Sequence, residues 1–242
     1  MYLKLQVEYD GTDFKGWQVQ PDQRTVQGEL EDRLETLFGQ AIRVTAAGRT
    51  DTGVHALGQV VSFSAPRPMP TDDLCHSLNE MLPPDVAVGE IQEVDEDFNA
   101  RFSATAREYY YDIHFGHRAI GRQYAWRRHA PLNVPALKAA AQGVLGNHDF
   151  TSFCVAAQER ESRVCDVTIC EWAERPNGLR MTIRANRFVR AMVRSLVGTF
   201  VDVGRGFTDP ADICRILDAR DRSAAGPTAP PHGLFLARVD YD

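Results

Sequence analysis

The sequence has no long apolar run and little that would support a disulfide framework or a metal centre. Its 242 residues contain no uninterrupted stretch of about 18 apolar residues, the length that a membrane-spanning helix requires. The first residues, MYLKLQVEYDG, do not form the pattern of a secretory signal, so we expect a cytoplasmic protein. The five cysteines are odd in number and include no C-x-x-C pair, which favours buried free thiols over disulfides or zinc ligands.

Lysine is rare, and the positive charge of the chain is carried almost wholly by arginine. There are 24 arginines and 3 lysines, and the formal net charge is −6. The arginines are unevenly spread: six occur between Arg175 and Val201 without one acid, and four more lie between Arg118 and Arg128. A basic face on an acidic chain suits a nucleic-acid partner. A GC-rich genome that encodes its cations as arginine would give the same composition, so the charge pattern alone leaves both explanations open.

The hydrophobic pattern alternates between strand and helix periods along the whole chain. Strands are expected at 3–9, 42–47, 59–63, 86–88, 102–115, 167–172, 179–185 and 234–239, and helices at 26–38, 71–82, 133–146, 186–200 and from 209 onward. Hairpin signals such as Pro176-Asn177-Gly178 favour an α+β fold over a purely parallel sheet. We therefore predict two similar ferredoxin-like (RNP-like) halves, 1–104 and 105–242, which form one broad mixed, mainly antiparallel sheet with helices on one face.

A loop with very little apolar content, AAGRTDTGVHALG, presents one acid beside one permanent cation. Asp51 lies between Gly48 and Gly53, which predicts a turn, and Arg49 and His55 flank it. An aspartate in such a turn commonly accepts hydrogen bonds from its own backbone, so a purely structural role is the alternative.

The strand end EYDGT could indicate a different function. A D-x-D-G-T motif would indicate an aspartyl-phosphate phosphohydrolase, but here the attacking position holds Glu8. No lysine-plus-diacid signature that could hold magnesium follows it. The simpler interpretation is that Asp10 and Gly11 form a turn.

The segment NRFVRAMVRSLVGTF has helical spacing and an unusual charge pattern. Arg187, Arg190 and Arg194 would lie on one side of the expected helix, and like charges at this spacing repel. Three of them without an acid suggest an anionic partner, either a phosphate or a buried carboxylate, since the guanidinium fork engages two oxygens. A solvated helix face remains the alternative.

Three consecutive tyrosines in REYYYDIHF lie on an expected strand. Tyr109 and Tyr111 share one face, and Tyr110 points to the other. An aromatic ring beside arginines is what an extruded base stacks on, whereas alternation alone favours core packing. His114 and His117 lack the further donors that a metal site would need, so no metal is expected.

The phrase AAGRTDTGVHALGQVV resembles the signature of the TruA family, the tRNA pseudouridine synthases that act on the anticodon arm. Matching blocks follow one another in the expected order: YDGTDFKGWQ (9–18), TVQGELE (25–31), FNARFSATAREYYY (98–111), GNHDFTSF (146–153), NRFVRAMVRSLVGTFVDVGRG (186–206) and APPHGLFL (229–236). The resemblance thus extends over nearly the whole chain. One departure is Thr52, where the family commonly has alanine.

The resemblance implies roles for individual residues. Asp51 matches the nucleophile, and Arg194 matches the arginine that forms an ion pair with it. Arg49 matches the residue that enters the space left by the flipped uridine, and Tyr109 the residue that stacks on the uracil. Arg187, Arg190 and His55 are further candidates for contact with the substrate.

The resemblance also implies an isomerase that uses no cofactor, acts as a homodimer and modifies uridines at tRNA positions 38 to 40. The carboxylate could add to C6 of uracil, attack C1′ or assist loss of the 2′ proton, and the sequence does not choose among these routes. A catalytically silent tRNA-binding or chaperone protein of the same fold is the competing hypothesis.

Overall fold

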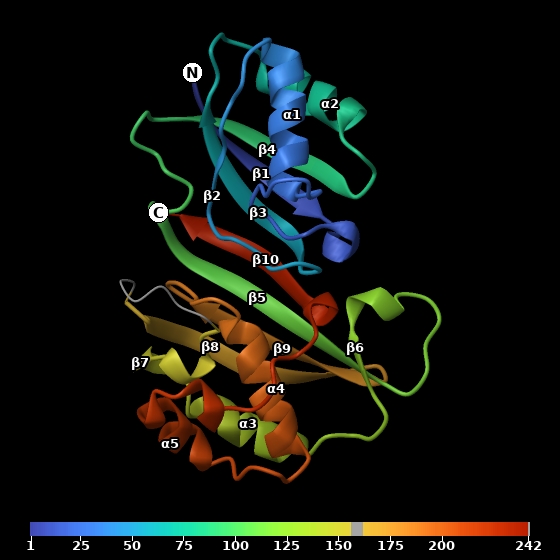
Figure 1. Ribbon diagram of the computed structural model, residues 1–242, viewed down its shortest axis with the longest axis vertical. Coiled ribbons are helices and arrows are strands. Elements are labelled where there is room, and N and C mark those ends of the chain that lie inside the picture. The colour runs from blue at the N-terminus through green and yellow to red at the C-terminus, as the bar shows by residue number, and fades with distance from the viewer. Residues whose placement is uncertain (156–161, 242) are drawn as a thin grey trace. The chain divides into compact units, whose positions relative to one another are not determined.

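The computed structural model describes residues 1–155 and 162–241, and it divides into two compact units (Figure 1). The first unit comprises Met1–Thr105 and Phe235–Asp242, and the second comprises Ala106–Leu234. The last strand, which the division by sequence assigned to the second half, thus belongs to the first unit.

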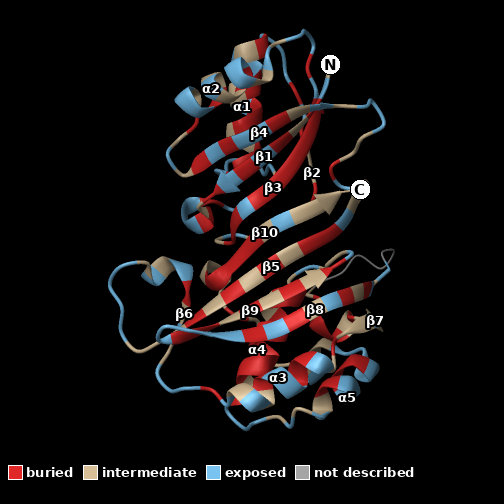
Figure 2. Cartoon of the chain, turned by 180° about the vertical axis from the view of Figure 1, so that it is seen from behind, coloured by how far each residue is buried: buried red, intermediate tan, exposed pale blue. Residues whose placement is uncertain are grey.

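The first unit has the order of elements of a ferredoxin-like half. Its elements are β1 (Tyr2–Tyr9), α1 (Val26–Phe38), β2 (Thr45–Ala46), β3 (His55–Ser64), α2 (Thr71–Met81), β4 (Val86–Val94) and β10 (Leu234–Tyr241). Strand β1 lies between β4 and β3 and is antiparallel to both, β2 is antiparallel to β3, and β10 pairs with β3 in parallel. Both helices lie on the same face of this sheet (Figures 1 and 2).

The local sequence accounts for these elements. In β1, Leu3, Leu5 and Val7 are fully buried and alternate with more exposed residues, as the period of two requires. Helix α1 begins after Thr25, whose side chain accepts a hydrogen bond from a backbone N–H of the first turn, and ends at Gly39, which adopts a left-handed conformation. The predicted bounds of α1 are confirmed.

The second unit repeats the alternation of strands and helices. Its elements are β5 (Ala104–Phe115), β6 (Trp126–Arg128), α3 (Val134–Gln142), β7 (Gly146–Asp149), β8 (Val164–Arg175), β9 (Gly178–Ala185), α4 (Met192–Gly204) and α5 (Asp212–Ala219). Strands β5, β9, β8 and β7 are neighbours in that order and antiparallel, and β6 pairs with β5 in parallel. The predicted α+β class and the mainly antiparallel pairing are therefore confirmed.

Helix α4 is the centre of the second unit's core. Almost all of its residues are buried, including Met192, Leu196 and Phe200 of the predicted apolar stripe. Trp172 of β8 packs edge-on against Phe200, with ring centroids 6.2 Å apart. The helix and the sheet therefore share one packed core.

Some predictions of detail were only partly right. All five cysteines are free thiols, but only Cys154, Cys165 and Cys170 are buried. The strand expected at 42–47 shrinks to β2, Thr45–Ala46. Within the described residues, no helix combines the length and the apolar character needed to cross a membrane.

Candidate active site

Asp51 lies in a tight turn between β2 and β3, as the glycine spacing predicts. The backbone carbonyl of Asp51 accepts a hydrogen bond from Val54 N at 3.1 Å, and Gly53 has a φ of 76°, a value that favours glycine. Asp51 is half-buried, and Thr52 is exposed at the tip. The turn therefore offers its carboxylate at the border between the protein interior and solvent.

Hydrogen bonds from separate elements hold the backbone on the N-terminal side of Asp51. The carbonyl of Thr50 accepts from Trp17 N at 3.1 Å, and the Thr50 hydroxyl lies 2.7 Å from the Tyr9 hydroxyl. Two residues earlier, the carbonyl of Gly48 accepts from Gln59 Nε2 at 2.8 Å. Because Thr50, Tyr9 and Gln59 are all buried, these bonds are shielded from water and fix the loop in one position. We call Tyr9, Thr50 and Gln59 the loop-anchoring residues.

Tyr9 is buried, with 3% of its surface exposed. Burial raises the pKa of Tyr9 to about 12, although its hydrogen bonds to Thr50 and Gln59 lower the pKa in part. Its hydroxyl is consequently protonated at neutral pH. The Tyr9 ring also packs against Trp17, with centroids 6.0 Å apart, so both residues that contact Thr50 support each other.

The chain just after β1 approaches the loop so closely that only glycine fits. A Cβ at Gly16 would lie 2.8 Å from the carbonyl oxygen of Thr50, and Gly16 has a φ of 91°. A Cβ at Gly11 would lie 2.0 Å from the carbonyl oxygen of Val54. The motif YDGTDFKGW therefore supplies the surface against which the Asp51 loop packs.

His55 supports this arrangement from the interior. Its side chain is 1% exposed and stacks on Phe235 with ring centroids 4.5 Å apart. Nδ1 lies 3.0 Å from both Gly11 N and Asp10 Oδ1. The backbone N–H can only donate, so Nδ1 accepts from it and the ring is held in one orientation. Because His55 is buried, its side chain supports the loop and is not exposed to a substrate.

Asp10 has a structural role of its own. It precedes the 3₁₀ helix Gly11–Asp13, and its Oδ1 accepts hydrogen bonds from Thr12 N at 3.0 Å and Thr12 Oγ1 at 2.6 Å. Glu8, in the position that a phosphohydrolase would need for attack, is exposed on β1. The turn interpretation of EYDGT is therefore the correct one. Arg49, two positions before Asp51, is exposed.

In the second unit, the tyrosines of β5 divide between the two faces as alternation predicts. Tyr109 is 8% exposed and packs edge-on against Phe188, with ring centroids 5.1 Å apart. Tyr111 is fully buried, donates a hydrogen bond to the carbonyl of Pro230 at 2.8 Å, and belongs to the core. Tyr110 points to the other face, where the Cζ of Arg180 lies over its ring, 3.7 Å from the ring centroid.

The helix expected at 186–200 begins later than predicted, which separates the three arginines. Helix α4 starts at Met192, and Ala191 has a left-handed φ of 59°. The carbonyl of Arg190 accepts from Val155 N at 3.1 Å instead of from a residue one turn on. The prediction that Arg187, Arg190 and Arg194 share one helix face is therefore wrong: the first two lie in the preceding loop, Arg187 half-buried and Arg190 exposed.

Arg194 occupies the first turn of α4 in a well-defined orientation. Its Nε donates to the carbonyl of Ala229 at 2.8 Å, and its own carbonyl accepts from Ala229 N at 3.0 Å. The guanidinium lies near the Tyr111 hydroxyl, whose pKa is raised by burial and partly lowered again by the charge of Arg194. The partner that orients the Arg194 guanidinium is thus a backbone carbonyl and not a flexible side chain.

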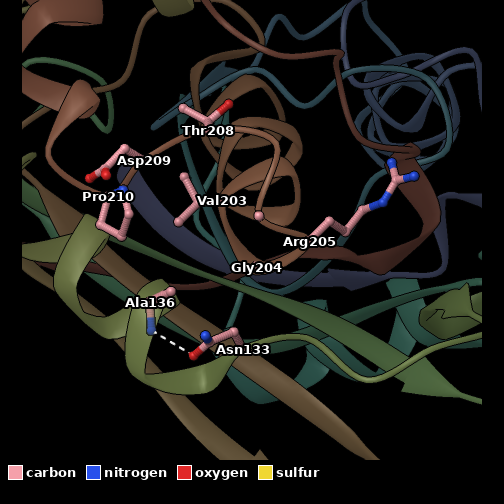
Figure 3. Close-up of a pocket in the computed structure, with 9 residues that line it drawn as sticks. Asn133, Ala136, Val203, Gly204, Arg205, Thr208, Asp209 and Pro210 are labelled. Carbon is pink, nitrogen blue, oxygen red and sulfur yellow. Dashed lines mark hydrogen bonds between the residues drawn. The ribbon is translucent and has the colours of Figure 1, made fainter.

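One hollow of the second unit is lined by other residues. It has a volume of about 450 Å³ and is lined by Asn133, Ala136, Val203, Gly204, Arg205, Gly206, Thr208, Asp209 and Pro210 (Figure 3). Asn133 Oδ1 accepts from Ala136 N at 3.1 Å there, as the cap of α3 (Figure 3). No predicted site residue lines it. Within the described residues no group of three or more histidine, cysteine or acidic side chains could hold a metal ion.

Comparison with known proteins gives a consistent result. The model of a family described as tRNA pseudouridine synthase matches residues 5–103 and 140–242. The chain is 44% identical over 246 residues to tRNA pseudouridine synthase A of Bacillus pumilus and 43% identical to that of Bacillus subtilis, with 100% of each chain covered. It is 46% identical to tRNA pseudouridine synthase A of Halalkalibacterium halodurans, over 98% of this chain and 91% of that protein.

Proposed function

Because the chain belongs to the tRNA pseudouridine synthase family, we propose that it isomerises uridine in the anticodon stem-loop of tRNA with Asp51 as the nucleophile. The family establishes uridine-to-pseudouridine isomerisation in tRNA as the activity. The choice of positions 38 to 40 and the role of each residue are our proposal. The observation that carries it is the buried anchoring of an otherwise polar loop around one half-buried carboxylate.

The reaction breaks the C1′–N1 bond of uridine, turns the uracil and joins C1′ to C5. A proton leaves C5 and N1 gains one, so the isomerisation balances without an oxidant, a reductant or a nucleotide. Asp51 can serve by adding to C6, by attacking C1′ or by assisting loss of the 2′ proton. Each route needs the carboxylate ionised and held still while the base moves, and the loop-anchoring residues provide the second condition.

An extruded uracil would exclude water from the carboxylate, and exclusion of water disfavours its charged form. A guanidinium at about 4 Å with an effective dielectric constant near 20 would offset this by roughly 4 kcal/mol. We propose that Arg194 supplies that cation. Its fixed orientation against Ala229 supports the role, since a positioned cation loses less conformational entropy on pairing than a mobile one.

The remaining predicted residues receive roles on the substrate side. Tyr109 would stack on the target uracil, and exposed Arg49 would enter the space that the flipped nucleotide leaves. Arg187 and Arg190 would contact phosphates from the loop before α4, while His55 acts through the Asp51 loop. We further propose that the enzyme works in the cytoplasm as a homodimer that binds tRNA.

Release of tritium from tRNA labelled at C5 of uridine tests the proposal, because binding alone liberates no tritium. Asp51→Asn keeps the size of the side chain and removes its charge, and we expect the release rate to fall by roughly 10³-fold or more. Asp32→Asn, which removes an exposed acid on α1 of the same unit, is the matched control and should retain wild-type release.

Affinity for tRNA, measured on the same proteins, separates catalysis from folding. We expect Asp51→Asn to bind tRNA with a Kd within a few-fold of wild type. Release by Asp51→Asn at the control rate would exclude Asp51 as the nucleophile. Loss of binding and release together would indicate that Asp51 holds the loop structure instead, and a wild-type protein that binds tRNA without release would favour the silent tRNA-binding hypothesis.

A further inference from the structure

A second, smaller hollow in the second unit is strongly basic. It has a volume of about 250 Å³ and lies where β5, the β8–β9 turn and the loop after β5 meet. Arg118, Arg175, Arg180 and His114 line it, and Asp112 is the only acid among its lining residues. We call these five residues the basic groove.

The single acid of the groove is already engaged. Both carboxylate oxygens of Asp112 accept from Arg180, Oδ1 from Nε and Oδ2 from NH2, each at 2.7 Å. The Cζ of the same guanidinium lies 3.7 Å from the centroid of the Tyr110 ring. Asp112 and Arg180 therefore compensate each other, and Arg118 and Arg175 give the groove a net positive charge. Arg118 is oriented by a hydrogen bond from its Nε to the carbonyl of Ile120 at 2.7 Å.

The floor of the groove is rigid. A Cβ at Gly178 would lie 2.2 Å from the carbonyl oxygen of Ile113, so β9 and β5 approach each other as closely as glycine permits. Phe115 N donates to the carbonyl of Asn177 at 2.8 Å, which ties the β8–β9 turn to the end of β5. A rigid floor keeps the cationic groups together although they repel one another, as an anion-binding site requires.

The segment from the end of β5 onward adds cationic residues and no acid. No aspartate or glutamate occurs from Ile113 to His148, although the chain as a whole has a net charge of −6. Near the groove, Arg127 NH1 lies 3.1 Å from His117 Nδ1, and Arg127 NH2 lies 3.5 Å from His129 Nε2. A cluster of cations on a protein of net negative charge attracts a polyanion to this place.

The groove is distinct from the proposed catalytic residues. Asp112 and His114 alternate with Tyr109 and Tyr111 along β5, so their side chains point to the other face of the strand. Residues 104–139 also lie outside the two ranges that the family model matches, so the family match assigns no role to Arg118 or His114.

We propose that the basic groove binds a backbone phosphate of the substrate tRNA at a nucleotide other than the one that reacts. This inference rests on the proposed function for the identity of the polyanion. Two guanidinium groups can each donate two hydrogen bonds to phosphate oxygens, and a backbone contact positions RNA without reading its sequence. The contact contributes affinity, and it takes no part in bond rearrangement.

The test is the salt dependence of tRNA binding by Arg118→Gln/Arg175→Gln. Loss of both guanidinium contacts to this phosphate should raise the Kd roughly tenfold near physiological salt and lower the slope of log K against log salt by about one. The maximal rate of tritium release should change by less than twofold. Arg118→Lys/Arg175→Lys keeps both charges and should restore most of the affinity.

The matched control is Arg43→Gln/Arg215→Gln, which removes the same charge from exposed arginines that pair with Glu31 and Asp212. A Kd and a salt slope equal to those of this control would overturn the proposal, as would a loss of maximal rate at unchanged Kd. Failure of the proposed function is recognised separately. In that case the wild-type protein would release no tritium, whatever the salt dependence of tRNA binding.

Discussion

The Asp51 loop and the arginine segment 187–194, which runs into the first turn of α4, supply the two halves of the proposed chemistry, and the chain holds them differently. Asp51 follows Thr50, whose backbone and side chain are both held by buried groups from other elements. Arg187 and Arg190 lie in a loop, and only Arg194 is mounted on a helix. Within the arginine segment, therefore, the residue proposed for chemistry is fixed, whereas those proposed for RNA contact lie on a less regular backbone.

Among substitutions other than at Asp51, the largest effect should come from breaking this distinction at Arg194. Arg194→Ala removes the proposed counter-charge of Asp51, and we expect the maximal rate of tritium release to fall about 100-fold, equivalent to about 2.7 kcal/mol of barrier. Arg190→Ala, only four residues earlier, should mainly raise KM, by a few-fold, since it loses a phosphate contact. If Arg194→Ala and Arg190→Ala changed KM and the maximal rate by equal factors, the proposed difference in role between the helix arginine and the loop arginine would be contradicted.

A smaller effect is expected from loosening the Asp51 loop without touching the acid. Thr50→Val keeps the shape of the side chain but leaves the buried Tyr9 hydroxyl without its 2.7 Å partner, at a cost of about 1–3 kcal/mol in folding free energy. We expect the maximal rate to fall roughly tenfold with KM little changed, because a loosened nucleophile is misplaced for reaction. Thr50→Ser should restore the rate, and a Thr50→Val enzyme as fast as wild type would show that the anchoring is dispensable.

The remaining effect concerns stability in alkali and not the catalytic rate, and it sharpens the role of Tyr9. Its pKa is about 12 in the folded chain and 10 for the free side chain, so the folded state favours the neutral phenol. This contribution is fully present below pH 10 and is lost as the pH rises towards 12, by about 2–3 kcal/mol in total. Denaturant unfolding from pH 9 to 12 should show a smaller loss for Tyr9→Phe, whereas identical pH profiles would contradict the burial of this hydroxyl.

The sequence predicted those features that depend on local periodicity and turn chemistry. Helix α1 has the expected bounds because Thr25 and Gly39 are strong local signals for its ends. The β8–β9 turn and the Asp51 turn follow from glycine and asparagine in positions that favour left-handed backbone. Alternation likewise placed Tyr109 and Tyr111 on one face of β5.

Features that depend on tertiary contacts could not be predicted in this way. Apolar spacing continues without interruption from Val189 into α4, and nothing local indicates that Ala191 would adopt a left-handed conformation. The carbonyl of Arg190 accepts a hydrogen bond from Val155 N, which is distant in sequence, and not from the next turn of a helix. The hydrogen bond between Tyr9 and Thr50 joins residues 41 positions apart, and the return of β10 to β3 spans most of the chain. Such contacts leave no periodic signal.

The most direct test of the central claim is a map of pseudouridine, nucleotide by nucleotide, in tRNA treated with wild-type protein and with Asp51→Asn. The account predicts pseudouridine within positions 38 to 40 after treatment with the wild type, and unmodified uridine at the same positions after treatment with the variant. Modification of those positions by Asp51→Asn, or wild-type modification confined to other parts of the tRNA, would contradict it.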